Sequence, residues 1–261
     1  MADADALRES GVSLPANQEP APQPPTAQPG DESVMSLVDH LGELRTRLFR
    51  AIIAVAIGSA IGFYVATPVR IFLQQPLNGI PLQVLGVGDA FIIQVKISLV
   101  IGIILAMPVL LYQIWAFVAP GLTPQERTTV RPWIPLALLF FAIGVVVAYA
   151  VLPFAIAFLF SFTGDGLEAR PAAGQYFDFV TTMFLVFGLI MEFPILLYGL
   201  SRVGIVTSQR LTSSRRMIIL GIAIFAAVAT PGGDLISPFV LGITMYILFE
   251  ATVLAIKRSG K

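Results

Sequence analysis

The chain has 261 residues, of which 56% are hydrophobic and only 12% are charged, a balance that excludes an ordinary soluble domain of this length. It has no cysteine and a single histidine, His40, which argues against disulfides, thiolate metal sites, bound haem and His-rich metal centres. The formal net charge is zero, so only the distribution of charge along the chain is informative. We expect an all-α, polytopic membrane protein with no metal and no cofactor.

Residues 1–34 differ from the rest of the chain, because six prolines fall there among Ala, Gln and acidic residues with almost nothing to bury. This stretch lacks the charged start, continuous apolar segment and cleavage site of a secretory signal. We therefore predict a disordered, Pro-rich cytoplasmic tail over 1–34, followed by a membrane domain over 35–261.

The first membrane span is predicted over the uncharged residues Ala51–Thr67. It is expected to end at Pro68, because proline and its predecessor disfavour further helix. The second span is expected to start near Asp89. Pro108 lies inside this uncharged run and is expected to kink the helix.

Four further spans follow at Pro132–Gly164, Phe177–Leu200, Met217–Thr230 and Phe239–Ile256. The third is long and is expected to bend at Pro153. The fifth has about 14 residues, or roughly 21 Å at 1.5 Å per residue, which is less than a usual hydrocarbon core and predicts a locally thinned bilayer. The sequence thus predicts six transmembrane helices.

Lysine and arginine positions give the orientation of these spans. Six spans place both termini on one side, and 13 of the 16 Lys and Arg residues fall on that side. Only Arg70, Lys96 and Arg170 fall on the other. Because cytoplasmic loops carry the excess of positive charge, both termini are predicted to be cytoplasmic.

Glu192 lies inside the otherwise apolar stretch Phe179–Ser201. A carboxylate at that depth costs roughly 2.5–3.5 kcal/mol on insertion scales unless it faces a partner or a watery hollow. We therefore expect a functional site at Glu192, with a plain interhelical hydrogen bond as the alternative.

Two more carboxylates, Glu43 and Glu126, belong to separate elements at the cytoplasmic surface. Each could take a guanidinium group in a charge-assisted, bidentate pair. The alternative is that Glu43 pairs with Arg47 four residues on, and Glu126 with a neighbouring arginine, as ordinary solvated charges. The residues alone favour this second interpretation.

Several phrases of the sequence, in this order and spacing, resemble TatC, the six-span subunit of the twin-arginine protein translocase. The resemblance covers nearly all of residues 35–256. The phrases are Asp39-His40-Leu-Gly-Glu-Leu-Arg45, Met107-Pro-Val-Leu-Leu-Tyr-Gln-Ile-Trp-Ala-Phe-Val-Ala-Pro-Gly-Leu122 followed by Glu126-Arg127, Phe187-Gly-Leu-Ile-Met-Glu-Phe-Pro194, Thr230-Pro-Gly-Gly-Asp234 and Met245-Tyr-Ile-Leu-Phe-Glu250.

The resemblance implies a concave helical bundle in the plasma membrane of a prokaryote, with Glu192 as the intramembrane acid facing the hollow. It implies a receptor for twin-arginine signal peptides of folded cargo, acting as a homo-oligomer with single-span partners of the TatA and TatB type. The family's signal-binding glutamates fall on Glu43 and Glu126, and export is expected to use the proton gradient. Catalysis and nucleic-acid binding are not expected.

Other residues match family positions, and each has a plainer alternative. Arg45 and Arg47 are expected to hold Glu43 in place or touch the signal peptide, with lipid phosphate as the alternative contact. Phe117 and Pro108 are expected to shape the signal groove, or to serve as a core aromatic and a helix kink.

Three charged residues are expected to contact partners or to stabilise the fold. Lys96 is expected to snorkel outward or to pair with Asp89. Asp234 is either a turn former on the outer face or a partner contact. Glu250 is expected to reach the interface or to meet a partner helix.

A small proton-coupled secondary transporter centred on Glu192 is the competing hypothesis, since buried acids and kinked helices are typical of such sites. The sequence shows no inverted repeat and no second broken helix to match. An intramembrane enzyme lacks a metal cluster, a His-based dyad and a Gly-rich phosphate loop.

Overall fold

The computed structural model of the chain describes residues 37–121, 133–164, 168–202, 204, 206–230 and 233–258. Packing divides the chain into two units, Met1–Leu41 and Gly42–Lys261. The described part of the first unit is the start of helix α1, and every contact reported below lies within the second unit. The predicted tail at 1–34 lies outside the described residues, so it stays a prediction.

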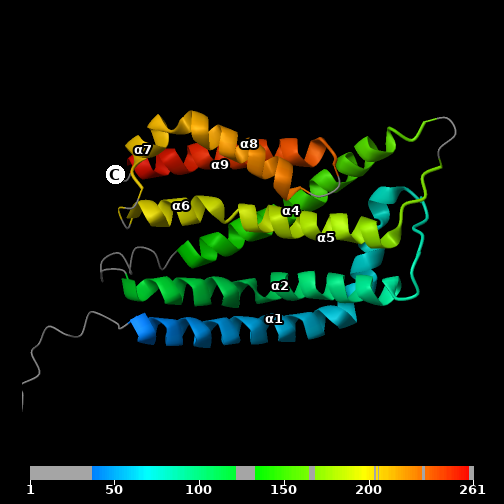
Figure 1. The fold of residues 1–261 in the computed structure, drawn as a ribbon, viewed down its shortest axis with the longest axis horizontal. Helices are drawn as coiled ribbons and strands as arrows, with labels where there is room; N and C mark the ends of the chain where they lie inside the picture. The colour runs from blue at the N-terminus through cyan, green and yellow to red at the C-terminus, as the bar shows by residue number, and fades with distance from the viewer. Residues whose placement is uncertain are drawn as a thin grey trace, which may run out of the picture. The chain divides into compact units, whose positions relative to one another are not determined.

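Within the described residues the regular elements are helices, with one isolated bridge between Gln83 and Ala172 (Figure 1). The α-helices are α1 (Leu37–Leu73), α2 (Asp89–Val118), α4 (Trp133–Phe160), α5 (Ala173–Ile190), α6 (Phe193–Arg202), α7 (Ser208–Ser213), α8 (Arg215–Ala229) and α9 (Ile236–Arg258). Two short 3₁₀ helices cover Gln75–Leu77 and Ala119–Gly121. The predicted all-α fold is confirmed.

Five helical segments among the described residues are long and apolar enough to cross a membrane. They are His40–Leu77, Asp89–Val118, Trp133–Phe160, Ala173–Ser201 and Ile236–Arg258. Helix α8 occupies the predicted fifth span but has only 15 residues, or about 22 Å of helix. A multi-pass membrane protein is therefore supported, and the sixth span stays a prediction.

The expected end of the first span at Pro68 is wrong, because α1 continues to Leu73 with Pro68 inside the helix. Inside a membrane, backbone polar groups must be hydrogen-bonded within the protein, and a continuous helix achieves this. That gain outweighs the local tendency of proline to end a helix. Tyr176 adds an anchor, since its buried hydroxyl donates to the Leu73 carbonyl at 2.5 Å. The predicted start of the second span at Asp89 is confirmed.

The predicted fourth span is interrupted at Met191 and Glu192, between α5 and α6. Pro194 explains the break, because its nitrogen has no hydrogen to donate and its ring clashes with the carbonyl of Ile190. The predicted span Phe177–Leu200 lies within the apolar helical segment Ala173–Ser201, which contains this break. The break places Glu192 in a turn rather than on a regular helix face.

Glycines allow the closest helix approaches. An added Cβ on Gly58 would lie 2.6 Å from the Gly102 carbonyl oxygen, and one on Gly62 would lie 2.6 Å from the Ser98 carbonyl oxygen, so α1 and α2 pack backbone to backbone. An added Cβ on Gly144 would lie 2.5 Å from the Phe187 carbonyl oxygen. Such contacts are typical of small residues at helix interfaces in membranes.

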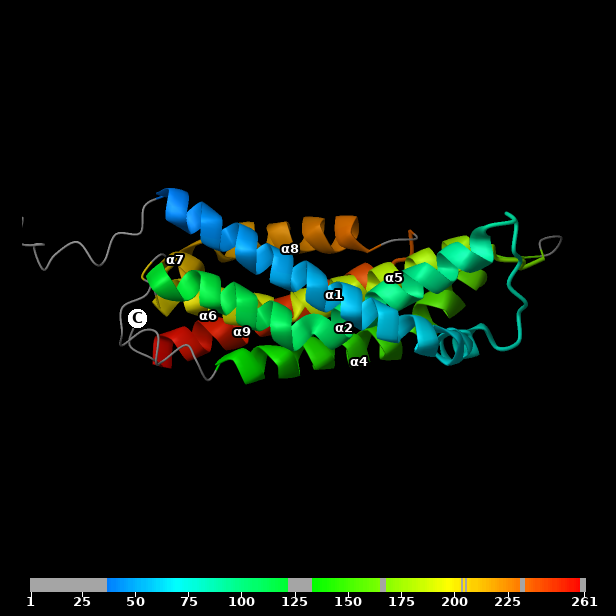
Figure 2. The same ribbon diagram turned by 90° about the horizontal axis from the view of Figure 1, so that it is seen from below.

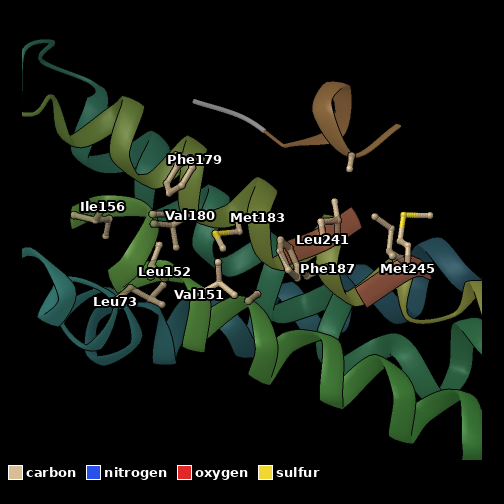
Figure 3. Packing of buried hydrophobic residues seen from close by; sticks show 14 of the residues in the cluster. Leu73, Val151, Leu152, Ile156, Phe179, Val180, Met183, Phe187, Leu241 and Met245 are labelled. Carbon is tan, nitrogen blue, oxygen red and sulfur yellow. The ribbon is translucent and has the colours of Figure 1, made fainter. Parts of the chain in front are cut away.

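The apolar core centres on α4 and α5, where Leu152, Val180, Met183 and Phe187 are buried (Figure 3). Helix α5 packs against α4 and α2, and α9 packs against α6, α8 and α4. Helix α8 lies beside α9 in Figure 1, and Figure 2 shows α1 passing in front of the other helices. These contacts set the frame that positions the polar residues described next.

Candidate functional site

Glu43 lies in α1, with only 19% of its side chain exposed. Arg47, one turn further on, donates from Nε to Glu43 Oε1 at 2.9 Å, and its Nη2 bonds the same oxygen. The pairing expected from i,i+4 spacing is therefore confirmed. The other carboxylate oxygen, Oε2, is buried and accepts no hydrogen bond from the described residues.

Gln113 of α2 supports Arg47 from the neighbouring helix. Arg47 Nη1 points to Gln113 Oε1 at 3.5 Å, and Gln113 is 9% exposed. Sequence reasoning missed this contact, although a polar residue in the apolar α2 is a signal that could have found it. One guanidinium thus connects the α1 carboxylate to an α2 amide.

Arg45 and Phe117, the other predicted signal-binding residues, have separate surroundings. Arg45 is exposed, and its guanidinium carbon lies 5.8 Å from the centre of the Phe49 ring, a cation–π contact. Arg45 is two residues from Glu43 in the sequence, so the two side chains lie on different sides of the helix. Phe117 is half-buried near the end of α2, and Pro108 is exposed inside that helix.

The second predicted signal-binding carboxylate, Glu126, lies outside the described residues. Its expected place near Glu43 therefore stays a prediction.

Glu192 is half-buried in the turn between α5 and α6. Its N–H donates to Leu189 O at 3.1 Å, and its carbonyl accepts from the N–H groups of Ile195 and Leu196, both at 3.1 Å. Its side-chain Oε1 is buried and accepts no hydrogen bond within the part of the chain that the structure describes. The backbone of this turn is satisfied, whereas the carboxylate still lacks a donor.

Lys96 does not pair with Asp89, so that expectation is wrong. Lys96 Nζ of α2 forms an ion pair with Asp178 of α5 instead. Asp89 is occupied at the start of its own helix, where its Oδ2 accepts from the N–H groups of Gly86 at 2.7 Å and Leu85 at 3.2 Å. Asp178 was not predicted as the partner of Lys96 because the two residues lie 82 positions apart in the sequence, on different helices.

Asp234 is buried, 3% exposed, and precedes α9. Its Oδ2 accepts from the N–H of Ser237 at 2.6 Å, in the first turn of α9, so this carboxylate satisfies a backbone donor at the start of the helix. Its Oδ1 and the Ser237 hydroxyl are buried without a partner among the described residues. Asp234 therefore has at least a structural role.

Glu250 of α9 pairs with Arg215, the first residue of α8, with Nη2 to Oε2 at 2.9 Å. The pair is partly exposed and links the two helices. A cation at a helix N-terminus is unfavourable by itself, so the Glu250 carboxylate offsets that cost.

No group of three or more His, Cys, Asp or Glu residues that could hold a metal ion occurs in the described segments. The structure brings Glu43, Arg47 and Gln113 together, and joins Lys96 to Asp178. The arrangement offers hydrogen-bond acceptors for a cationic or polar partner.

Residues 39–243 match the family model described as Sec-independent protein translocase protein (TatC). The TatC protein of Azotobacter chroococcum is 38% identical over 234 residues, which cover 87% of this chain and 91% of that protein. The TatC protein of Carboxydothermus hydrogenoformans is 34% identical over 230 residues, which cover 87% of this chain and 95% of that protein.

Two crystal structures of the twin-arginine translocase receptor TatC share the fold with a TM-score of 0.74. One is 35% identical and the match covers 83% of this chain and 99% of that one; the other is 34% identical, with coverage of 85% and 100%. The family model, the relatives and the solved structures each match most of this chain. The chain therefore belongs to the TatC family and is a multi-pass membrane subunit of the Sec-independent protein translocase.

Proposed function

We propose that this chain is the receptor for twin-arginine signal peptides, and that Glu43 and Glu126 each bind one of the two arginines. The observation that carries the proposal is the buried Glu43 Oε2, which has no donor in the described structure. A buried acceptor without a donor is unfavourable, so an arriving guanidinium would relieve that cost.

The pairing with Arg47 limits how the first arginine can bind. Two Arg47 nitrogens already contact Glu43 Oε1, which leaves a single oxygen for a second guanidinium. The incoming arginine therefore makes a one-oxygen contact, or a bidentate contact only if Arg47 turns further toward Gln113. Arg47 would also neutralise part of the carboxylate charge, which favours the directed hydrogen-bond donors of an arginine over the point charge of a lysine.

The charges along the helices support placing this site at the cytoplasmic surface of a prokaryotic plasma membrane. Arg45, Arg47 and Arg50 lie near the start of α1, and Lys257 and Arg258 lie at the end of α9. The opposite end of α1 carries only Arg70. By the positive-inside rule both termini are cytoplasmic, with α8 as a short fifth span of six.

Glu192 serves a later step in this proposal, which is assembly with single-span partners of the TatA and TatB type. Its buried Oε1 lacks a donor, and a polar side chain on a partner helix would supply one inside the membrane. The receptor acts as a homo-oligomer, and the transmembrane proton gradient supplies the energy for export.

Peptide binding to the full-length chain in lipid nanodiscs tests this function. A peptide with two arginines is compared with the same peptide carrying two lysines, using the unaltered chain, Glu43→Gln and Glu126→Gln. Glu168→Gln is the matched control, because Glu168 is exposed and pairs with Arg170 beside α5. We expect arginine-dependent binding that weakens in the first two variants and not in the control. Equal binding of both peptides to the unaltered chain would exclude the receptor function.

A further inference from the structure

An apolar groove of 400 Å³ opens on the second unit between α1, α2, α4 and α5. We call it the α1–α4 groove. Its lining includes Leu73, Ile101, Leu105, Val146, Tyr149 and Phe184. None of the residues that carry the proposed receptor function lines it.

The surface that the described residues present to the α1–α4 groove is apolar. Thr181, the polar lining residue of α5, donates its hydroxyl to the Phe177 carbonyl at 2.5 Å. Phe72 of α1 and Tyr149 of α4, which both line the groove, stack with ring centres 4.7 Å apart and connect the two helices. The occupant must therefore be apolar along its length.

The dimensions of the groove favour a flexible chain over a helix. Its α2 wall runs from Ile97 to Leu105, about 12 Å at 1.5 Å per residue. This wall is much shorter than a partner span, which needs about 20 residues or roughly 30 Å, so the groove suits part of a hydrocarbon chain.

Arg70 provides a charged group beside the groove. It lies in the last turn of α1, between the lining residues Val69 and Phe72. Its Nε is buried without an acceptor, and no carboxylate of the described residues forms a salt bridge with it. A guanidinium at the end of a membrane helix fits the phosphate of a lipid headgroup.

We propose that the α1–α4 groove holds one acyl chain of an anionic phospholipid whose phosphate is bound by Arg70. In the proposed topology this lipid belongs to the outer leaflet. The site uses neither Glu43 nor Glu192, so it stands or falls independently of the receptor function.

Native mass spectrometry of the full-length chain tests the proposal, with phosphatidylglycerol and phosphatidylcholine added in turn after delipidation. We expect one tightly bound phosphatidylglycerol per chain. The preference over phosphatidylcholine should be about tenfold, because both headgroups carry a phosphate but the choline cation of phosphatidylcholine is repelled by the Arg70 guanidinium. Equal retention of the two lipids, or no retained lipid, would overturn the proposal.

Two pairs of variants locate the lipid. Val146→Trp fills the groove and should remove the retained lipid, whereas Val228→Trp makes the same change on an exposed position of α8 and should not. Leu105→Trp repeats the groove-filling test from α2 if Val146→Trp misfolds. Loss of the lipid in Val228→Trp, or its retention in a folded groove-filling variant, would contradict the site.

Arg70→Gln should keep the acyl chain in place but abolish the preference for phosphatidylglycerol. Arg216→Gln, on the exposed surface of α8, is the matched control and should leave the preference unchanged. A preference that persists in Arg70→Gln would exclude Arg70 as the phosphate anchor.

Discussion

Glu43 and Glu192 each have one buried carboxylate oxygen without a donor among the described residues, but their surroundings differ. Glu43 lies on a regular helix beside Arg47, which already contacts its other oxygen. Glu192 lies in the break between α5 and α6, and no salt bridge to it occurs among the described residues. In the proposed function, the first site binds a charged ligand next to a cation, and the second accepts from a hydrogen-bond donor inside the membrane.

This comparison implies that the two carboxylates serve separable steps. A change at Glu192 should affect assembly with partners and leave peptide binding intact. A change at Glu43 should affect peptide binding first. The predictions below test that separation.

The largest effect is expected from Glu192→Leu, which should abolish translocation of a folded cargo into membrane vesicles. Because the change removes a buried oxygen without a donor, the purified chain should gain about 1 kcal/mol of stability rather than lose it. Peptide binding should match that of the unaltered chain. Full translocation activity in Glu192→Leu would remove Glu192 from the mechanism.

Glu43→Gln should weaken binding of the twin-arginine peptide by about 10- to 100-fold, because a hydrogen bond to a charged group contributes about 1.5–3 kcal/mol. Titration of a fluorescent peptide measures the change. Glu192→Gln is the matched control, since it makes the same substitution at the other carboxylate. If the two variants weaken binding equally, the separation of the two sites is wrong.

A smaller effect is expected from Arg47→Lys. Lysine keeps the charge but cannot contact Glu43 Oε1 through two nitrogens while also reaching Gln113. We expect about a two- to fivefold loss of peptide affinity, the range of a partly exposed ion pair.

Gln113→Leu should produce a similar loss of peptide affinity. The double variant should lose less affinity than the sum of the two single losses. Additive losses would show that Gln113 does not act through Arg47.

The smallest effect is expected from Pro194→Ala, which restores an N–H that can donate to the Ile190 carbonyl. The break at Met191 and Glu192 should become more helical, and hydrogen exchange of these two amides should slow. Unchanged exchange would show that side-chain packing, and not Pro194, maintains the break. Pro153→Ala in α4, where the proline lies inside a continuous helix, is the comparison.

Patterns that depend on neighbours in sequence were predicted well. The apolar runs located the helices, and the i,i+4 spacing indicated the Glu43–Arg47 pair. The predicted end of the first span was wrong because the tendency of Pro68 to end a helix is only a local preference. Backbone hydrogen bonding in the membrane and the contact of Tyr176 with Leu73 outweigh it.

Contacts between distant helices were not predictable in the same way. Lys96 pairs with Asp178, and Arg47 reaches Gln113, only because α2 packs against α5 and α1. No period or spacing in the sequence specifies these partners. The burial of Asp234 was missed for a related reason, since a Pro-Gly-Gly-Asp phrase indicates a turn but not what covers it.

The most direct test of the central claim is a double-mutant cycle between the arginines of the signal peptide and the two glutamates. Peptides with Arg-Lys, Lys-Arg and Lys-Lys in place of the pair are titrated against the unaltered chain, Glu43→Gln and Glu126→Gln. The account predicts that each glutamate couples to one arginine. Once either partner of a pair is replaced, replacing the other should change the peptide affinity very little. Coupling energies near zero for every pair would contradict the assignment of one carboxylate to each arginine.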